Sequence, residues 1–195
     1  MITIVDYDCG NIRSVICALQ RLGAEYEFSA DPGRIASSPK VLLPGVGNAA
    51  QALQSLRAKG LVEAIKGRRK PVLGICVGMQ IMCRHCEEGD VDALELFDTV
   101  VSRFSPAPEA KVPHMGWNRI SNLESKLFKG VDEGSSVYFV HSYRPLLCTD
   151  TIATCRHGDE LFSAALKYEN FYGTQFHPEK SGGVGEKILG NFISL

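Results

Sequence analysis

The sequence has no long hydrophobic run and no strong excess of one charge. None of its apolar stretches approaches the ~18 residues that a membrane-spanning helix needs, so no span is predicted. The formal net charge is −1, and the longest basic run covers only residues 66–70. We interpret this run as a solvated helix end, because nucleic-acid-binding domains are usually basic as a whole. The sequence therefore predicts neither a membrane nor a nucleic acid as a partner.

The cysteines also lack the arrangement of a disulfide framework. There are seven of them, an odd number, scattered along the chain. This predicts free thiols in a reducing compartment, and with it a cytoplasmic location. The first residues lack the basic region of a signal peptide and are expected to form a strand. Cys83 and Cys86 form a C-x-x-C pair, but no second Cys or His pair stands at a zinc-site spacing. We expect both to pack inward from one face of a helix, and we predict no metal site.

Length and composition predict a single domain that spans residues 1–195. The chain has 195 residues, 45% of them hydrophobic and 22% charged, which is enough apolar surface for one core. It contains no internal repeat, low-complexity tract or linker.

Strand and helix patterns alternate through the first half. Apolar runs at 2–6, 24–28, 41–43 and 72–75 predict strands, and residues 11–23, 48–59 and 61–66 predict helices. Strands then dominate at 99–104, 137–141, 151–156, 162–168 and 171–175, before a helix at 185–192. We therefore predict an α/β three-layer sandwich with a mainly parallel central sheet and an appended antiparallel portion.

Residues 71–80 carry the strongest chemical signal. Gly74-Ile75-Cys76-Val77-Gly78 follows a buried strand and matches G-x-C-x-G, the cysteine form of the nucleophile elbow. We expect Cys76 at the N-terminus of a helix that begins near Met79 and reaches Cys86. There the helix dipole and free N–H groups would favour a reactive thiolate. A buried cysteine in a tight turn explains this motif equally well by itself.

A base and an acid follow late in the chain. Pro178 biases His177 toward extended backbone, in which His177 and Glu179 would point the same way. A carboxylate in that place holds an imidazole in one tautomer, so that it can take a proton from a thiol. Reactive groups gather beyond the carboxyl ends of parallel strands, so this segment is expected near Cys76. A surface turn is the alternative.

Pro44-Gly45-Val46-Gly47 is the third segment expected at this edge. Its glycines would allow a peptide N–H to turn into the cleft, although a simple turn would need them as well. Acyl transfer needs two such donors for the developing oxyanion, and the Val77 N–H would be the second.

Together these motifs resemble those of the class I, or triad, glutamine amidotransferases. The matching pieces are 44–47, 74–80 and 177–179, and the chain order of cysteine, histidine and glutamate is also the same. Segments 6–11, 112–118 and 137–144 are similar to those of the glutaminase subunits of imidazole glycerol phosphate synthases. The resemblance covers essentially the whole chain and implies a flavodoxin-like sheet.

The resemblance implies that Cys76 attacks the side-chain amide of glutamine, His177 transfers protons and Glu179 orients His177. A glutamyl thioester forms and is hydrolysed to glutamate, without a metal or cofactor. Backbone groups of Val46, Gly47 and Val77 are the implied oxyanion site. Implied substrate contacts are Gly45, Gln80, Glu88, Ser142 and Tyr143, although Glu88 could be a solvated acid. Val77 stands where the family often has leucine, which is conservative because only the N–H is needed.

The resemblance further implies a heterodimer with a (β/α)₈ cyclase subunit. Ammonia would pass through a tunnel into that subunit for histidine biosynthesis. Asn11, Tyr138 and Lys180 match family positions near the interface, although each could be a plain surface residue. Cys9, in the same N-terminal segment as Asn11, has no expected role.

Several other functions compete with this one. A glutaminase of pyridoxal phosphate or anthranilate synthesis, or a γ-glutamyl hydrolase, would share the triad, but segments 6–11 and 114–118 disfavour them. A non-catalytic binding module on the same fold would be expected to lose the thiol, the histidine or the acid, and none is lost. Zinc-dependent hydrolysis is the remaining alternative.

Overall fold

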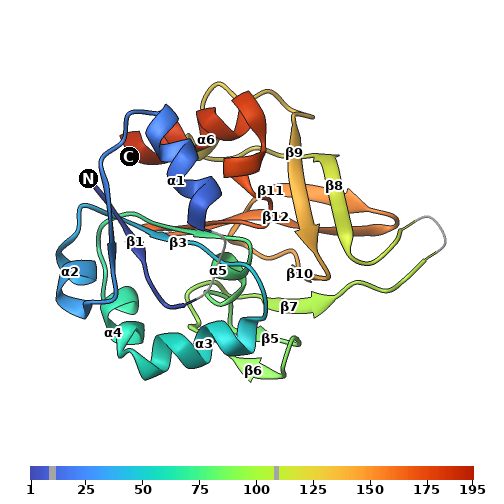
Figure 1. The fold of residues 1–195 in the computed structure, drawn as a ribbon. Coiled ribbons are helices and arrows are strands. Elements are labelled where there is room, and N and C mark those ends of the chain that lie inside the picture. The colour runs from blue at the N-terminus through green and yellow to red at the C-terminus, as the bar shows by residue number, and fades with distance from the viewer. Residues whose placement is uncertain (9–11, 108–109) are drawn as a thin grey trace.

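The structure of the protein is a computed structural model that describes residues 1–8, 12–107 and 110–195. Within these ranges a seven-stranded sheet has the order β11-β12-β13-β4-β3-β1-β2 (Figure 1). Its parallel strands are β1 (Ile2–Val5), β2 (Tyr26–Ser29), β3 (Lys40–Leu43), β4 (Val72–Ile75) and β13 (Phe171–Thr174). The antiparallel strands β12 (Glu160–Tyr168) and β11 (Thr151–His157) extend one edge. The predicted mainly parallel sheet with an antiparallel portion is confirmed.

Helices cover both faces of this sheet. In Figure 1, α1 (Ile12–Arg21) and α6 (Gly182–Ser194) lie on one side, and α2 (Pro32–Ser37), α3 (Ala49–Ala58) and α4 (Leu61–Lys66) on the other. The α3 helix begins where the Asn48 side chain accepts a hydrogen bond from the Gln51 N–H, and it buries Leu53 and Leu56. Each helix needs only one apolar face to pack on the sheet. The sheet and the helices on its two sides therefore form three layers.

Two small sheets stand beside the main one. Strand β8 (His114–Arg119) pairs antiparallel with β9 (Ser136–His141). A second sheet has the order β10-β7-β5-β6, from β10 (Tyr143–Pro145), β7 (Val100–Arg103), β5 (His85–Cys86) and β6 (Val91–Asp92). The short one-turn elements are η1 (Lys126–Phe128) and η2 (Pro178–Lys180). The sequence did not predict α2, β5, β6, β8 or β10, because these segments are short or lack regular apolar alternation.

The helix expected from Met79 to Cys86 is wrong beyond its first turn. Helix α5 covers only Val77–Gln80, and β5 follows at His85–Cys86. The backbone of Arg84 and Glu87 bonds to β7 and its neighbours instead, which pulls the chain out of the helix. Cys83 and Cys86 are both fully buried, as expected, but not from one helical face.

The basic run at 66–70 is also not simply a solvated helix end. Arg68 is only 2% exposed, and its guanidinium donates to the carbonyl oxygens of Ile35, Ala36 and Ser38. These carbonyls are at the C-terminal end of α2, where a cation complements the helix dipole. Arg68 therefore joins α2 to the segment that precedes β4.

Across residues 1–8, 12–107 and 110–195, none of the helices is both long and apolar enough to span a bilayer.

Candidate active site

The nucleophile elbow is built by close backbone packing. Cys76 lies between β4 and α5 with φ 53° and ψ −111°, a strained conformation for a residue with a side chain. A Cβ added at Gly78 would stand 1.9 Å from the Leu43 carbonyl oxygen, and one at Gly74 would stand 2.5 Å from the Gly78 carbonyl oxygen. The two glycines of G-x-C-x-G are therefore required by the turn, and they hold Cys76 at the end of β4.

The Pro44–Gly47 loop packs directly on this elbow. A Cβ at Gly45 would come within 2.3 Å of the Gly78 nitrogen, so Gly45 lies behind the elbow and does not line the cavity beside it. Val46, Gly47 and Val77 do line that cavity, as the oxyanion prediction requires. Gly47 has a φ of +99°, which favours glycine.

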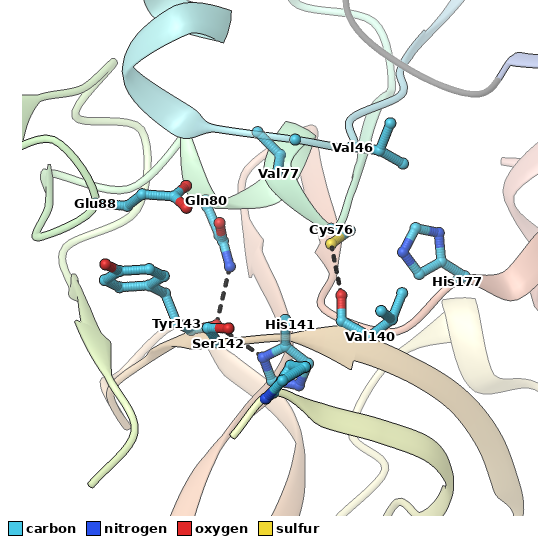
Figure 2. A pocket seen from close by; sticks show the side chains of 12 residues that line it. Val46, Cys76, Val77, Gln80, Glu88, Val140, His141, Ser142, Tyr143 and His177 are labelled. Atoms are coloured by element: carbon cyan, nitrogen blue, oxygen red, sulfur yellow. Dashed lines mark hydrogen bonds between the residues drawn. The ribbon is translucent and has the colours of Figure 1, made fainter. Parts of the chain in front are cut away.

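His177 reaches Cys76 because their strands are neighbours. Ile75 of β4 is paired with Thr174 of β13, and the Cys76 N–H donates to the Thr174 carbonyl oxygen at 2.7 Å. The chain leaves β13 and places the His177 ring beside the Cys76 sulfur (Figure 2). Two parallel strands that end together thus bring residues about a hundred positions apart into one site.

Glu179 lies against the other nitrogen of the imidazole. Its Oε1 accepts a hydrogen bond from His177 Nδ1 at 2.7 Å, and the side chains of His177 and Glu179 are 1% and 3% exposed. His177 itself has the expected extended backbone, with φ −97° and ψ 96°, but Pro178–Lys180 form the 3₁₀ turn η2 and do not continue as a strand. The turn still folds the carboxylate onto Nδ1, which leaves Nε2 as the nitrogen available to the thiol.

This environment determines the charge of His177. Burial lowers the pKa of an imidazole, but the nearby Cys76 sulfur and the Glu179 carboxylate outweigh burial and raise the pKa of His177 to about 10. The imidazolium is thus stabilised between two groups that can carry negative charge. Such an arrangement accepts the thiol proton readily and holds it for a leaving group.

A cavity of about 250 Å³ opens onto the sulfur. Its walls include Gln80, Glu88, Ser142 and Tyr143, which are four of the five residues expected to contact substrate. Glu88 Oε2 accepts a hydrogen bond from the Ala49 N–H at 2.8 Å, at the start of α3. Glu88 is therefore a positioned carboxylate at the cavity wall, which suits the ammonium group of an amino acid.

Further residues at the site were not predicted. Pro113, Val140 and His141 line the cavity. Gln175 is fully buried, and its Nε2 donates to the Cys76 sulfur at 3.6 Å. A signal for His141 was present: residues 137, 139 and 141 alternate inward along β9, so a histidine at the third inward position faces the core.

Tyr138 and Lys180, two of the residues expected at a subunit interface, lie next to the site. The Lys180 ammonium stands 6.0 Å from the centre of the Tyr138 ring, and the Tyr138 carbonyl oxygen accepts the His177 N–H at 2.9 Å. Met115 and Trp117, on the adjoining strand β8, are 62% and 59% exposed. Asn11 and Cys9 lie outside the described residues.

No group of three or more His, Cys, Asp or Glu side chains is arranged to hold a metal ion in the part of the chain that the structure describes.

A thiol, an imidazole, a carboxylate on that imidazole and backbone groups at a helix start are the groups that acyl transfer requires. The family model for "Glutamine amidotransferase class-I" matches residues 3–195. The chain is 53% identical over 195 residues to the imidazole glycerol phosphate synthase subunit HisH of Bacteroides thetaiotaomicron, covering 100% of this chain and 99% of that one. It is 46% identical to the protein of the same name from Shewanella loihica, over 98% of this chain and 89% of that one.

Solved structures agree on the fold. One from Thermoplasma acidophilum, described as a putative GMP synthase protein, superposes with a TM-score of 0.75 at 24% identity, covering 99% of this chain and 92% of that one. A second, described as a glutamine amidotransferase, has a TM-score of 0.73 at 18% identity, over 100% and 98% of the two chains. From the family match and the full-length identity to curated relatives, the chain belongs to the class I glutamine amidotransferase family.

Proposed function

We propose that this chain is the glutaminase subunit of an imidazole glycerol phosphate synthase in histidine biosynthesis. As a single domain, it would hydrolyse glutamine to glutamate and pass the ammonia to a separate (β/α)₈ cyclase subunit. One observation carries the proposal: Cys76 and His177 line one cavity of a size that suits an amino acid, and Glu179 is bonded to His177 on the side away from it. The identity to relatives named as subunits of that synthase supports the choice of pathway.

The first half of the reaction forms a thioester. The Cys76 sulfur attacks the side-chain carbonyl carbon of glutamine while its proton passes to His177 Nε2. Negative charge develops on the carbonyl oxygen and is stabilised by N–H groups of the 46–47 loop and of Val77. His177 then gives its proton to the amide nitrogen, the C–N bond breaks and ammonia leaves.

The second half restores the thiol. His177 takes a proton from a water molecule, which attacks the thioester carbonyl. The C–S bond then breaks, glutamate leaves, and His177 returns the proton to the Cys76 sulfur. Glu179 keeps the His177 ring in the same tautomer through both halves. Glu88 binds the ammonium group of the substrate, while Gln80, Ser142 and Tyr143 hold the amino-acid end.

The cyclase subunit is proposed to dock where β8 and β9 meet η2. Exposed Met115 and Trp117 lie there beside half-buried Tyr138 and Lys180, a patch with a large aromatic share, which is typical of interface cores. The Tyr138 backbone also accepts the His177 N–H, so a partner on this patch would sit next to the catalytic base. Asn11 is proposed for the same interface.

The test is glutamate release from glutamine by the chain alone, and then with the cyclase partner and its nucleotide ligand. We expect weak activity alone and strong activation in the loaded complex. Cys76→Ser should lower glutamine-dependent synthesis by about 10⁴-fold or more, because the nucleophile is lost. Ammonia-dependent synthesis by the partner should stay near the wild-type rate.

Cys148→Ser is the matched control, since it removes a thiol outside the cavity. Equal loss of the glutamine- and ammonia-dependent reactions in Cys76→Ser would contradict two separate sites. Full glutaminase activity without the partner would contradict activation by it.

A further inference from the structure

A second set of polar groups, separate from His177 and Glu179, approaches Cys76. Gln175 Nε2 donates to the Cys76 sulfur at 3.6 Å, and Gln175 Oε1 accepts from Gln80 Nε2 at 3.0 Å. Gln80 Nε2 also donates to the Tyr143 carbonyl oxygen at 3.0 Å. The His141 Nδ1 lies 2.7 Å from the same oxygen (Figure 2).

The set continues through a second buried histidine. His141 Nε2 is 3.0 Å from His114 Nδ1, and His114 Nε2 is 3.1 Å from Asn118 Nδ2. The Asn118 amide also donates to the Arg156 carbonyl oxygen at 2.8 Å. We call Asn118, His114, His141, the Tyr143 carbonyl, Gln80 and Gln175 the neutral chain.

The acceptors in the neutral chain fix both histidine tautomers. A carbonyl oxygen can only accept, so His141 must carry its proton on Nδ1. Its Nε2 is then an acceptor, which requires the proton of His114 on Nδ1 as well. His114 Nε2 accepts in turn from the Asn118 amide. Every bond from Asn118 to Tyr143 therefore runs in one direction.

The surroundings keep these imidazoles uncharged. His114 and His141 are 4% and 6% exposed, and the Phe104 ring packs against both. Burial, together with the His157 imidazole, lowers the pKa of His114 to about 4. Burial lowers the pKa of His141 to about 3, with the Tyr143 carbonyl opposing and the imidazoles of His114, His157 and His177 adding to the effect. Neither is therefore suited to transfer protons near neutral pH, and both are suited to hold their neighbours in place.

We propose that His141, oriented by His114, is a positioning residue that fixes the Tyr143 carbonyl and thereby the amides of Gln80 and Gln175 at the Cys76 sulfur. The inference deepens the proposed glutaminase function and rests on it. Both N–H groups of the Gln80 amide are used, one on Tyr143 and one on Gln175. If the Tyr143 carbonyl moves, Gln80 loses one anchor and Gln175 loses its alignment with the sulfur.

The neutral chain therefore acts on two parts of the reaction. Ser142 and Tyr143 form a wall of the cavity, so their position affects glutamine binding. The N–H of Gln175 points at the sulfur, where a donor stabilises the thiolate that attacks.

The neutral chain is also connected to the proposed docking patch. Strand β8, which carries His114 and Asn118, also exposes Met115 and Trp117. The proposed docking patch and the neutral chain thus share one strand.

His141→Phe and His141→Asn test the proposal in the complex with the cyclase and its nucleotide ligand. Phenylalanine removes both ring nitrogens, and we expect kcat/KM for glutamine to fall about 10- to 100-fold, as for unsatisfied buried polar groups. KM should rise and kcat should fall together. Asparagine places an amide N–H close to the position of Nδ1, so it should restore a large part of the loss.

A purely structural defect would behave differently. It would lower the fraction of active enzyme, so kcat would fall while KM stayed unchanged, and asparagine would be no better than phenylalanine. His157→Gln is the matched control, because His157 stacks on His114 but bonds to the Lys111 carbonyl outside the neutral chain. It should keep both kinetic constants near those of the wild type.

The tautomers can be measured without any assay of activity. Two-bond ¹⁵N–¹H spectra of the full-length wild-type chain with labelled histidine should show two buried neutral Nδ1–H imidazoles between about pH 5 and 8. Nε2–H tautomers or imidazolium signals for His114 and His141 would overturn the proposal, as would kinetic constants of His141→Phe that match the wild type. Absence of glutaminase activity in the wild-type complex would instead overturn the proposed function, while the spectra would still report on the neutral chain.

Discussion

Two polar arms meet at the Cys76 sulfur, and they differ in charge. The charged arm is the pair His177 and Glu179, both buried and joined by a 2.7 Å hydrogen bond. The neutral chain forms the other arm, and it runs through Gln175 and Gln80 to the buried histidines of β8 and β9. Both arms contain histidine, but the pKa of His177 is raised to about 10 and the pKa of His141 is lowered to about 3.

The difference shows what decides the task of an imidazole. His177 has a carboxylate on one nitrogen and a sulfur near the other, so its charged form is stabilised and it can move protons. His141 has a carbonyl on one nitrogen and another imidazole on the other, with aromatic rings around it. Burial there has no opposing charge to offset it, so the neutral form prevails. The same side chain is therefore proposed as the base in one arm and as a positioning residue in the other.

The largest expected effect comes from the charged arm. Glu179→Gln should lower kcat for glutamine about 10²- to 10⁴-fold, because the imidazolium loses its carboxylate and the tautomer is no longer fixed. The pKa of His177 should fall, since Glu179 is one of the groups that raise it. Steady-state kinetics and a histidine NMR titration measure the two effects.

Glu169→Gln is the matched control for that variant, because Glu169 is an exposed acid in the turn between β12 and β13. It should leave both the rate and the His177 titration unchanged. A wild-type kcat in Glu179→Gln would contradict the proposal that the Glu179 carboxylate supports His177 in the reaction.

An intermediate effect is expected at the first link of the neutral chain. Gln175→Met keeps the buried volume roughly constant but removes the N–H on the sulfur, so kcat should fall about 10-fold, the worth of one hydrogen bond to a charged group. Alkylation of Cys76 by iodoacetamide should slow in parallel. Gln54→Met, on an exposed position of α3, is the control. If alkylation were as fast as in the wild type, Gln175 would not act on the sulfur.

The smallest effect expected is on stability in acid. His114 and His141 bind protons in the unfolded chain below pH ~6.5 but in the folded chain only near pH 4 and 3. The unfolded state therefore binds more protons in this window, so the free energy of unfolding falls as pH falls. His141→Asn should reduce that slope by about 1 kcal/mol per pH unit between about pH 6 and 4.5.

Urea unfolding of the wild type, His141→Asn and His157→Gln at several pH values measures the slopes. The expected order is a steeper slope for the wild type and His157→Gln than for His141→Asn. An unchanged slope in His141→Asn would mean that His141 is charged in the folded protein.

Local sequence patterns were sufficient for the sheet and the elbow. The apolar run Val72–Ile75 became β4 within the predicted bounds, and the predicted helix at 61–66 is α4. They failed for the segment after Gln80, where the helical pattern was overridden by backbone pairing with β7. They also failed at His114, because the inward positions of β8 are His114, Gly116 and Asn118, while its apolar residues Met115 and Trp117 are exposed, so no apolar alternation marks the buried face.

The sequence alone determined the elements whose signal is local: the glycines around Cys76, the short buried strands, and the adjacency of a histidine and a glutamate near the end of the chain. Each depends on residues within a few positions of one another, so steric fit and apolar pattern suffice. Only the tertiary structure decided which imidazoles carry charge and which groups reach the sulfur. Those properties depend on burial and on hydrogen bonds between residues such as Gln175 and Cys76, far apart in the chain, which no local pattern encodes.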